Sequence, residues 1–275
     1  MTIAGRNRVL ILGICITGIV LVGTIYGCVT VFAQKLLVSF PVSVQNPLWL
    51  LRQQLFVYNN YAKMIGIASF PLIALFILIT TFVLFEKTHA LEISFFSLFV
   101  FSLSVEALQL LFPLQKLYPL LTVFFAPLAR VILFFRFCAC LSLLTSSLFA
   151  HKTFTRQTWT IIFLLSFMSF SLAHTIPVNT ADTPSFLLFS QSYLYLLYSF
   201  NGIICLLAVL SFLFVGIYRS IPEYRHAALW LLTALAAYAL LLHTSSWFFI
   251  ATGIAALTLG LFFFTRAIHR FYLWQ

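Results

Sequence analysis

The sequence predicts an all-α fold, a polytopic bundle of about eight transmembrane helices. Two observations lead to this prediction: 63% of the 275 residues are hydrophobic and only 7% are charged, whereas about 25% is usual in a soluble domain. The apolar residues also form long runs that short polar turns separate. A soluble chain of this composition could not cover its apolar surface, so the solvent of most side chains must be lipid.

The first apolar run covers residues 9–33 and follows a basic start that contains Arg6 and Arg8. Val31 and Ala33 stand where a signal peptidase prefers small residues, and cleavage there would leave seven spans. The run is, however, much longer than the hydrophobic part of a signal peptide, which has about 7–15 residues. The sequence therefore favours an uncleaved first span.

Seven further spans are expected downstream within a single integral membrane domain. The linker 34–63 and the stretch 186–199 lie between spans and predict short helices at the membrane surface, since Asn46 and Pro47 can start such a helix in the linker. The expected spans after the first are 64–84, 93–112, 120–148, 159–173, 200–218, 227–242 and 247–264.

The positive charges predict the orientation. If both termini are inside, nine of the 15 Lys and Arg residues fall in inner segments and four in outer ones, as the positive-inside rule requires. The sequence thus predicts a multi-pass protein of the plasma (inner) membrane with cytoplasmic N and C termini. The basic residues are scattered singly and form no recognition motif, so no nucleic-acid partner is expected.

Cofactors, metal sites and catalytic residues are not predicted. The five cysteines lie within apolar runs, and Cys138 and Cys140 would point about 200° apart on a helix, so they cannot share a metal ion. Known hydrolase, metalloprotease and nucleotide-binding motifs are absent from the sequence. The sequence leaves enzymatic activity open and favours its absence.

Two residues of opposite charge, Glu106 and Arg130, lie within the apolar segments. At the rise of an α-helix, Glu106 should lie about 9 Å and Arg130 about 15 Å below the outer surface. A charge in the middle of the membrane costs at least about 2.5–3.5 kcal/mol on insertion scales, so we expect these two residues to pair. Ser102 and Gln109 share the face of Glu106, while Arg136 is expected to reach the inner headgroups.

Three other polar residues, His174, Asn201 and His243, are expected in the outer half of the membrane. Two interpretations are open for the whole set. Either Glu106, Gln109 and Arg130, with Ser102, His174, Asn201 and His243, line a binding site for a small polar ligand or ion, or Glu106 and Arg130 only hold two helices in register.

The function that follows is a non-enzymatic membrane protein that binds a small ligand or a partner in signalling or membrane-complex assembly. The alternative is a transporter of small solutes or ions that uses Glu106, Gln109 and Arg130. Besides the lipid bilayer, the expected partner is another membrane protein or a second copy of the chain, because Gly23 and Gly27 form a G-x-x-x-G motif in the first span.

Overall fold

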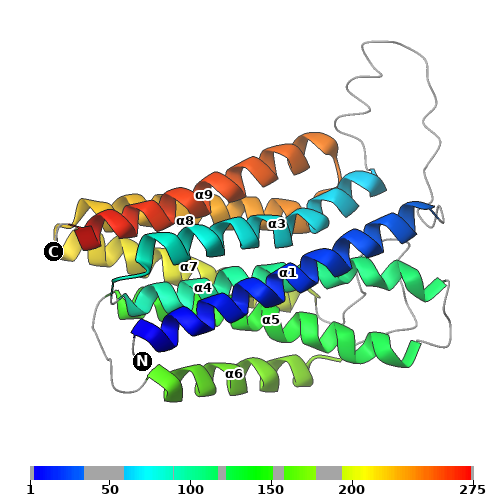
Figure 1. The fold of residues 1–275 in the computed structure, drawn as a ribbon, viewed down its shortest axis with the longest axis horizontal. Coiled ribbons are helices and arrows are strands. Elements are labelled where there is room, and N and C mark those ends of the chain that lie inside the picture. The colour runs from blue at the N-terminus through cyan, green and yellow to red at the C-terminus, as the bar shows by residue number, and fades with distance from the viewer. Residues whose placement is uncertain are drawn as a thin grey trace, which may run out of the picture.

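The computed structural model describes residues 3–33, 59–88, 90–116, 122–150, 158–177 and 194–273, and the regular structure in these residues is helical throughout. Eight helices in this part of the chain are long and apolar enough to cross a membrane. They lie side by side with their axes roughly aligned (Figure 1). The prediction of an all-α polytopic bundle is confirmed.

The helices overlap the expected segments and are mostly longer. Their bounds are α1 Ile3–Ala33, α3 Asn60–Phe85, α4 Leu91–Val105, α5 Thr122–Phe149, α6 Thr158–Thr175, α7 Leu194–Tyr218, α8 Pro222–His243 and α9 Trp247–Leu273. Helix α4 continues directly into a 3₁₀ helix, η1, Glu106–Lys116. The even number of crossings brings the two described ends of the chain to the same end of the bundle (Figure 1).

The sequence predicts two segments at the membrane surface, residues 34–63 and 186–199. Most of the linker helix, residues 34–58, and the first part of the second surface stretch, up to residue 193, lie outside the described residues. Residues 194–199 were also expected at the membrane surface, but they belong to α7, which begins at Leu194 rather than near residue 200. The tyrosines of this stretch therefore start a span instead of preceding one.

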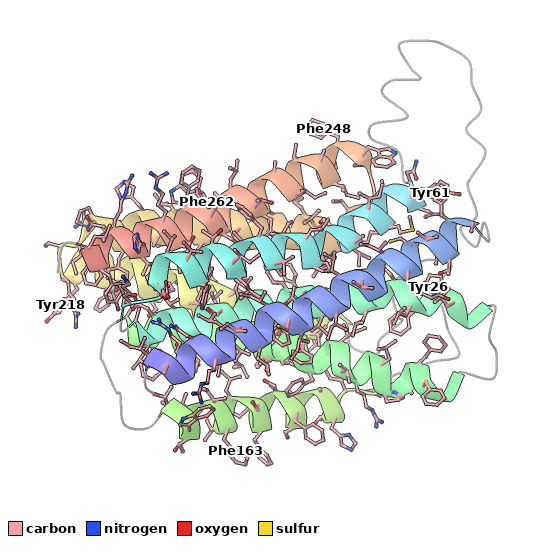
Figure 2. All side chains as sticks on the ribbon, viewed as in Figure 1. Tyr26, Tyr61, Phe163, Tyr218, Phe248 and Phe262 are labelled. Carbon is pink, nitrogen blue, oxygen red and sulfur yellow. The ribbon has the colours of Figure 1, made fainter. Side chains whose placement is uncertain are left out.

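The bundle is apolar on the inside and on much of the outside. Helices α3, α4, α8 and α9 share the largest cluster of buried residues, whereas α6 packs mainly on α5 at the edge of the molecule. Phe163 on α6 is 74% exposed, and Figure 2 shows it projecting away from the helices, as does Phe248 on α9. Side chains of this kind belong in lipid rather than in water.

Close contacts between helices depend on small residues. The α8–α9 pair is the tightest: a Cβ added to Gly260 would lie 2.9 Å from both the Ala234 Cβ and the Trp230 carbonyl oxygen. By contrast, Gly23 in the predicted G-x-x-x-G motif has nothing within 4 Å of an added Cβ, and Gly27 meets only a Leu111 methyl at 3.6 Å. Gly27 is buried within its own chain, and a contact of Gly23 with a partner stays a prediction.

The turn between α7 and α8 is a Schellman motif. The Ile221 N–H donates to the Gly216 carbonyl oxygen at 3.1 Å, and the Ser220 N–H donates to the Ile217 carbonyl oxygen at 3.2 Å. Ser220 occupies the left-handed region with φ 55°. Gly216 permits the tight return, since an added Cβ would lie 2.8 Å from the backbone nitrogen of Arg225.

Two buried cations bind carbonyl groups where helices end. Arg6 donates to the carbonyl oxygens of Phe85, Thr88 and, at 3.3 Å, Glu86, which ties α1 to the end of α3. Lys63, which the sequence places in an outer segment, is 3% exposed in the first turn of α3. Its Nζ donates to the carbonyl oxygens of Leu241 at 3.1 Å and Thr244 at 3.2 Å, and to that of Leu242. A cation there offsets the negative end of α8.

Candidate functional site

Glu106 lies at the junction of α4 and η1 and is 2% exposed. Its carboxylate accepts two hydrogen bonds from Arg136 on α5, from Nε to Oε1 at 2.8 Å and from Nη2 to Oε2 at 2.6 Å. Tyr238 on α8 donates its hydroxyl to Oε1 at 2.9 Å, and Gln109 donates its amide to Oε2. This bidentate ion pair joins α5 and α8 to the α4–η1 rod.

The expected pair of Glu106 with Arg130 is wrong, because Arg136 is the partner and Arg130 is exposed on α5. The expected depth of Glu106 was counted from residue 112 as the outer end of the span, whereas η1 continues to Lys116 and rises more steeply than an α-helix. A 3₁₀ helix rises about 2.0 Å per residue, so ten residues of η1 put Glu106 about 20 Å from its outer end. At about 1.5 Å per residue, Arg136 lies about 21 Å into α5 and Arg130 only about 12 Å. Arg136 therefore pairs with Glu106 instead of reaching the inner headgroups.

The other expected site residues divide into two groups. Ser102 is buried, but its hydroxyl donates to the Leu98 carbonyl oxygen in its own helix at 2.8 Å. His174 is exposed on α6 and stacks on Phe170. Asn201 and His243 come together instead, since both line a pocket between α5, α7 and α8.

This pocket has a volume of about 280 Å³ and a mostly apolar lining. It borders the ion pair, because Arg136 and Tyr238 form part of its wall, whereas Glu106 does not line it. Near the ends of α7 and α8, the Tyr198 ring meets His243 edge-on, with 4.5 Å between ring centroids. The lining residues are Arg136, Cys140, Tyr198, Asn201, Gly202, Cys205, Leu206, Val209, Leu232, Leu235, Ala236, Tyr238, Ala239, Leu242 and His243.

The pocket opens at the side of the bundle. Gly202 and Leu206 on α7 and Leu232 and Ala236 on α8 line it and are exposed in the described structure. These residues lie within two helices that are long and apolar enough to span a membrane. The opening between α7 and α8 therefore faces the region where lipid chains lie.

Two polar groups in this pocket have hydrogen-bonding capacity left over. Asn201 is 9% exposed, and its Oδ1 accepts no hydrogen bond from the described residues. Arg136 uses Nε and Nη2 for Glu106, and no hydrogen bond of Nη1 is found within the described part of the chain. The pocket thus presents one acceptor and one donor among apolar side chains.

A second buried acid, Glu92, falls between two of the expected spans, 64–84 and 93–112. It lies in the first turn of α4, where the helix dipole favours a negative charge, and it is 2% exposed. The Tyr224 hydroxyl donates to its carboxylate oxygens at 3.0 and 3.2 Å. No sequence signal separated Glu92 from Glu86 six residues earlier, since both belong to the same polar stretch.

Among the residues around Glu106, sequence reasoning missed Tyr238 and misplaced Arg136. Tyr238 stands among alanines and leucines of an apolar segment, and tyrosines in such segments also serve at the membrane surface. Arg136 could have been found as the arginine nearer the midpoint of the expected span 120–148, because a guanidinium at the centre of a span needs a partner more than one nearer its ends does.

Comparison with known proteins adds one similarity. A protein of Treponema pallidum (strain Nichols) described as an "Uncharacterized protein" is 26% identical to this chain over an alignment of 345 residues that covers the whole of both chains. No family model matches the sequence, and no solved structure matches it. The fold and the apolar helices define the class: this is a multi-pass helical membrane protein.

Proposed function

We propose that this protein binds a small amphiphilic ligand in the pocket between α5, α7 and α8, and that it acts without catalysis as a ligand-binding module in the membrane. The observation that carries the proposal is a pocket that opens at its side onto lipid and whose wall holds two polar groups, Asn201 Oδ1 and Arg136 Nη1, with no hydrogen bond to another described residue. An apolar pocket with a few convergent polar groups is the usual form of a small-molecule site.

The chemistry of the pocket restricts the ligand. Glu106 already neutralises Arg136, and three carbonyl oxygens already surround Lys63. A charged ligand would enter a largely apolar site without a free counterion. The best fit is a neutral molecule with an apolar body and a hydroxyl or amide end, since such an end both donates to Asn201 Oδ1 and accepts from Arg136.

The alternative of solute or ion transport has less support. The Glu106 carboxylate already accepts four hydrogen bonds, two of them from Arg136 and one each from Gln109 and Tyr238. An ion or proton that used this carboxylate would have to break the bidentate pair. The other buried acid, Glu92, does not line this pocket.

Filling the pocket tests the proposal. Gly202 lines it and has nothing within 4 Å of an added Cβ, and Gly18 on α1 has the same open surroundings far from the pocket. Native mass spectrometry of the chain extracted in polymer nanodiscs should find a small molecule on the wild type and on Gly18→Phe. Gly202→Phe should lose it. The same bound molecules in all three proteins would contradict the proposal.

We further propose that both termini face the cytoplasm and that the membrane is the plasma (inner) membrane. The basic residues near the ends of α1 and α9, such as Arg8, Arg266 and Arg270, support this orientation. Alkaline phosphatase fused after Gln275 should stay inactive, and a fluorescent protein at the same place should fluoresce. An active phosphatase there would invert the orientation.

A further inference from the structure

Cys140 and Cys205 face each other across the contact of α5 with α7, and the Cys205 thiol donates to the Cys140 sulfur at 3.6 Å. We propose that these two residues form a reversible dithiol–disulfide site in the wall of the pocket. A disulfide bond is about 2.05 Å long, so the sulfur atoms have to approach by about 1.5 Å. Side-chain rotation with a small shift of α7 supplies such a movement.

The two thiols stand one helical turn away from the polar groups of the pocket. Cys140 follows Arg136 by four residues on α5, and Cys205 follows Asn201 by four residues on α7, so each pair shares a helix face. All four residues line the pocket. The thiols therefore face the cavity from two opposed helices rather than being sealed in the core.

Both access and room to move are present. Cys205 is half-buried and Cys140 is buried, and the same cavity wall contains both. Open space lies beside α7 one turn earlier, since an added Cβ at Gly202 meets nothing within 4 Å. A small apolar reagent that enters from the membrane can reach the pair, whereas a highly charged reagent has to leave water to do so.

The other cysteines of the described structure are placed differently. Cys138 packs in another cluster with Phe95, Phe149 and Leu165, on a different face of α5 from Cys140. Cys15 is exposed on α1, and Cys28 lies further along the same helix. Cys138 is a matched control, because it is buried at a similar depth on the same helix.

The reaction is a two-electron oxidation by a small uncharged acceptor of hydrogen, of the quinone or diazene class. Two S–H bonds break and one S–S bond forms, and the acceptor takes up two electrons and two protons to become a quinol or a hydrazine. The product ties α5 to α7 beside Arg136 and draws the two walls of the pocket together. A dithiol reductant reverses the reaction by exchange.

Diamide, a membrane-permeant diazene, is the probe. The full-length protein in detergent micelles is treated with diamide and denatured, and its remaining thiols are counted by gel shift after reaction with maleimide–polyethylene glycol. The wild type should lose two of its five thiols and regain them with dithiothreitol. Cys138→Ser should also lose two, whereas Cys140→Ser and Cys205→Ser should lose none.

Three results would overturn the proposal. The wild type could keep all its thiols, the loss could persist in Cys140→Ser, or the lost thiols could appear as a covalent dimer on a non-reducing gel. Peptide mapping of the oxidised protein adds a direct check, since the Cys140 and Cys205 peptides should be joined. The experiment uses no pocket ligand, so a negative result here leaves the ligand proposal standing.

Discussion

Replacing Arg136 by methionine removes the ionic partner of Glu106 and keeps a side chain of similar length. In the wild type, Arg136 supplies two of the four hydrogen bonds that the carboxylate accepts. In Arg136→Met, Glu106 would keep only Gln109 and Tyr238 in a position where it is 2% exposed. The variant leaves a buried charge without a counterion, which is the costly way to break such a pair.

The expected loss in the free energy of unfolding is about 3–5 kcal/mol, the usual cost of removing one partner of a buried ion pair. Counting bonds gives a similar figure, because two hydrogen bonds to a charged group contribute about 1.5–3 kcal/mol each. A loss of 3 kcal/mol lowers the folding equilibrium constant by a factor on the order of 100. The change therefore lies well above the error of an unfolding titration.

The assay is unfolding by sodium dodecyl sulfate in mixed micelles, followed by the fluorescence of the five tryptophans. Arg130→Met is the control, since Arg130 is exposed on the same helix, and it should change the free energy by less than about 0.5 kcal/mol. The double variant Arg136→Met with Glu106→Gln should lose less than the sum of the two single variants, because neither charge is then left alone.

Two results would refute this reasoning. One is an equal loss in Arg130→Met and Arg136→Met, which would mean that the loss in Arg136→Met does not come from an ion pair specific to Arg136. The other is simple additivity of Glu106→Gln and Arg136→Met, which would mean that the two side chains do not interact in the folded protein.

Three further predictions use the same unfolding assay or its thermal equivalent. Gly260→Ala should lower the free energy of unfolding by about 1–3 kcal/mol, because it overpacks the α8–α9 contact. Gly18→Ala, where the Cβ position is open, should leave that free energy unchanged, and equal losses in the two variants would contradict the close contact. Ser220→Gly should raise the melting temperature, because it removes a left-handed residue that bears a Cβ; a lower melting temperature would argue against this turn. Lys63→Met should lower the free energy of unfolding by about 1–3 kcal/mol and speed amide hydrogen exchange at the end of α8. Unchanged exchange there would contradict the role of Lys63 in binding the last carbonyl groups of α8.

The helices could be predicted from the sequence because lipid imposes one simple condition. Each span must be apolar over about 20 residues and must satisfy its own backbone hydrogen bonds, and both conditions are visible in the apolar runs. The ends of the helices could be predicted less closely. Arg266 and Arg270 were taken to follow the last span, yet α9 continues to Leu273, because long basic side chains can extend from a helix end into the headgroups.

The site was predicted only in part, for a geometric reason. Burial of Glu106 beside Gln109 followed from residue type and helical spacing, but its partner depended on whether residues 106–116 form an α-helix or a 3₁₀ helix. Nothing in the sequence EALQLLFPLQK decides this. The steeper rise adds about 5 Å over ten residues, and residues 113–116, which lie outside the expected span, add about 6 Å more, so Glu106 lies about 11 Å deeper than expected. That shift transfers the ion pair from Arg130 to Arg136.

Hydrogen bonding distinguishes the buried polar groups that join helices from the polar group that marks a binding site. The buried charges of the described residues, Arg6, Lys63, Glu92, Glu106 and Arg136, all have hydrogen-bond partners within the chain, and they are sufficiently explained by the joining of helices. Two buried amides differ: Gln109 is bonded to Glu106, whereas the carbonyl oxygen of Asn201 accepts no hydrogen bond from any residue that the structure describes. An unpaired amide costs about 1–3 kcal/mol, and Asn201 stands at a cavity that opens to lipid. A group from outside the chain is the simplest way to recover that energy, so Asn201, more than the ion pair, is the residue that marks this pocket as a binding site.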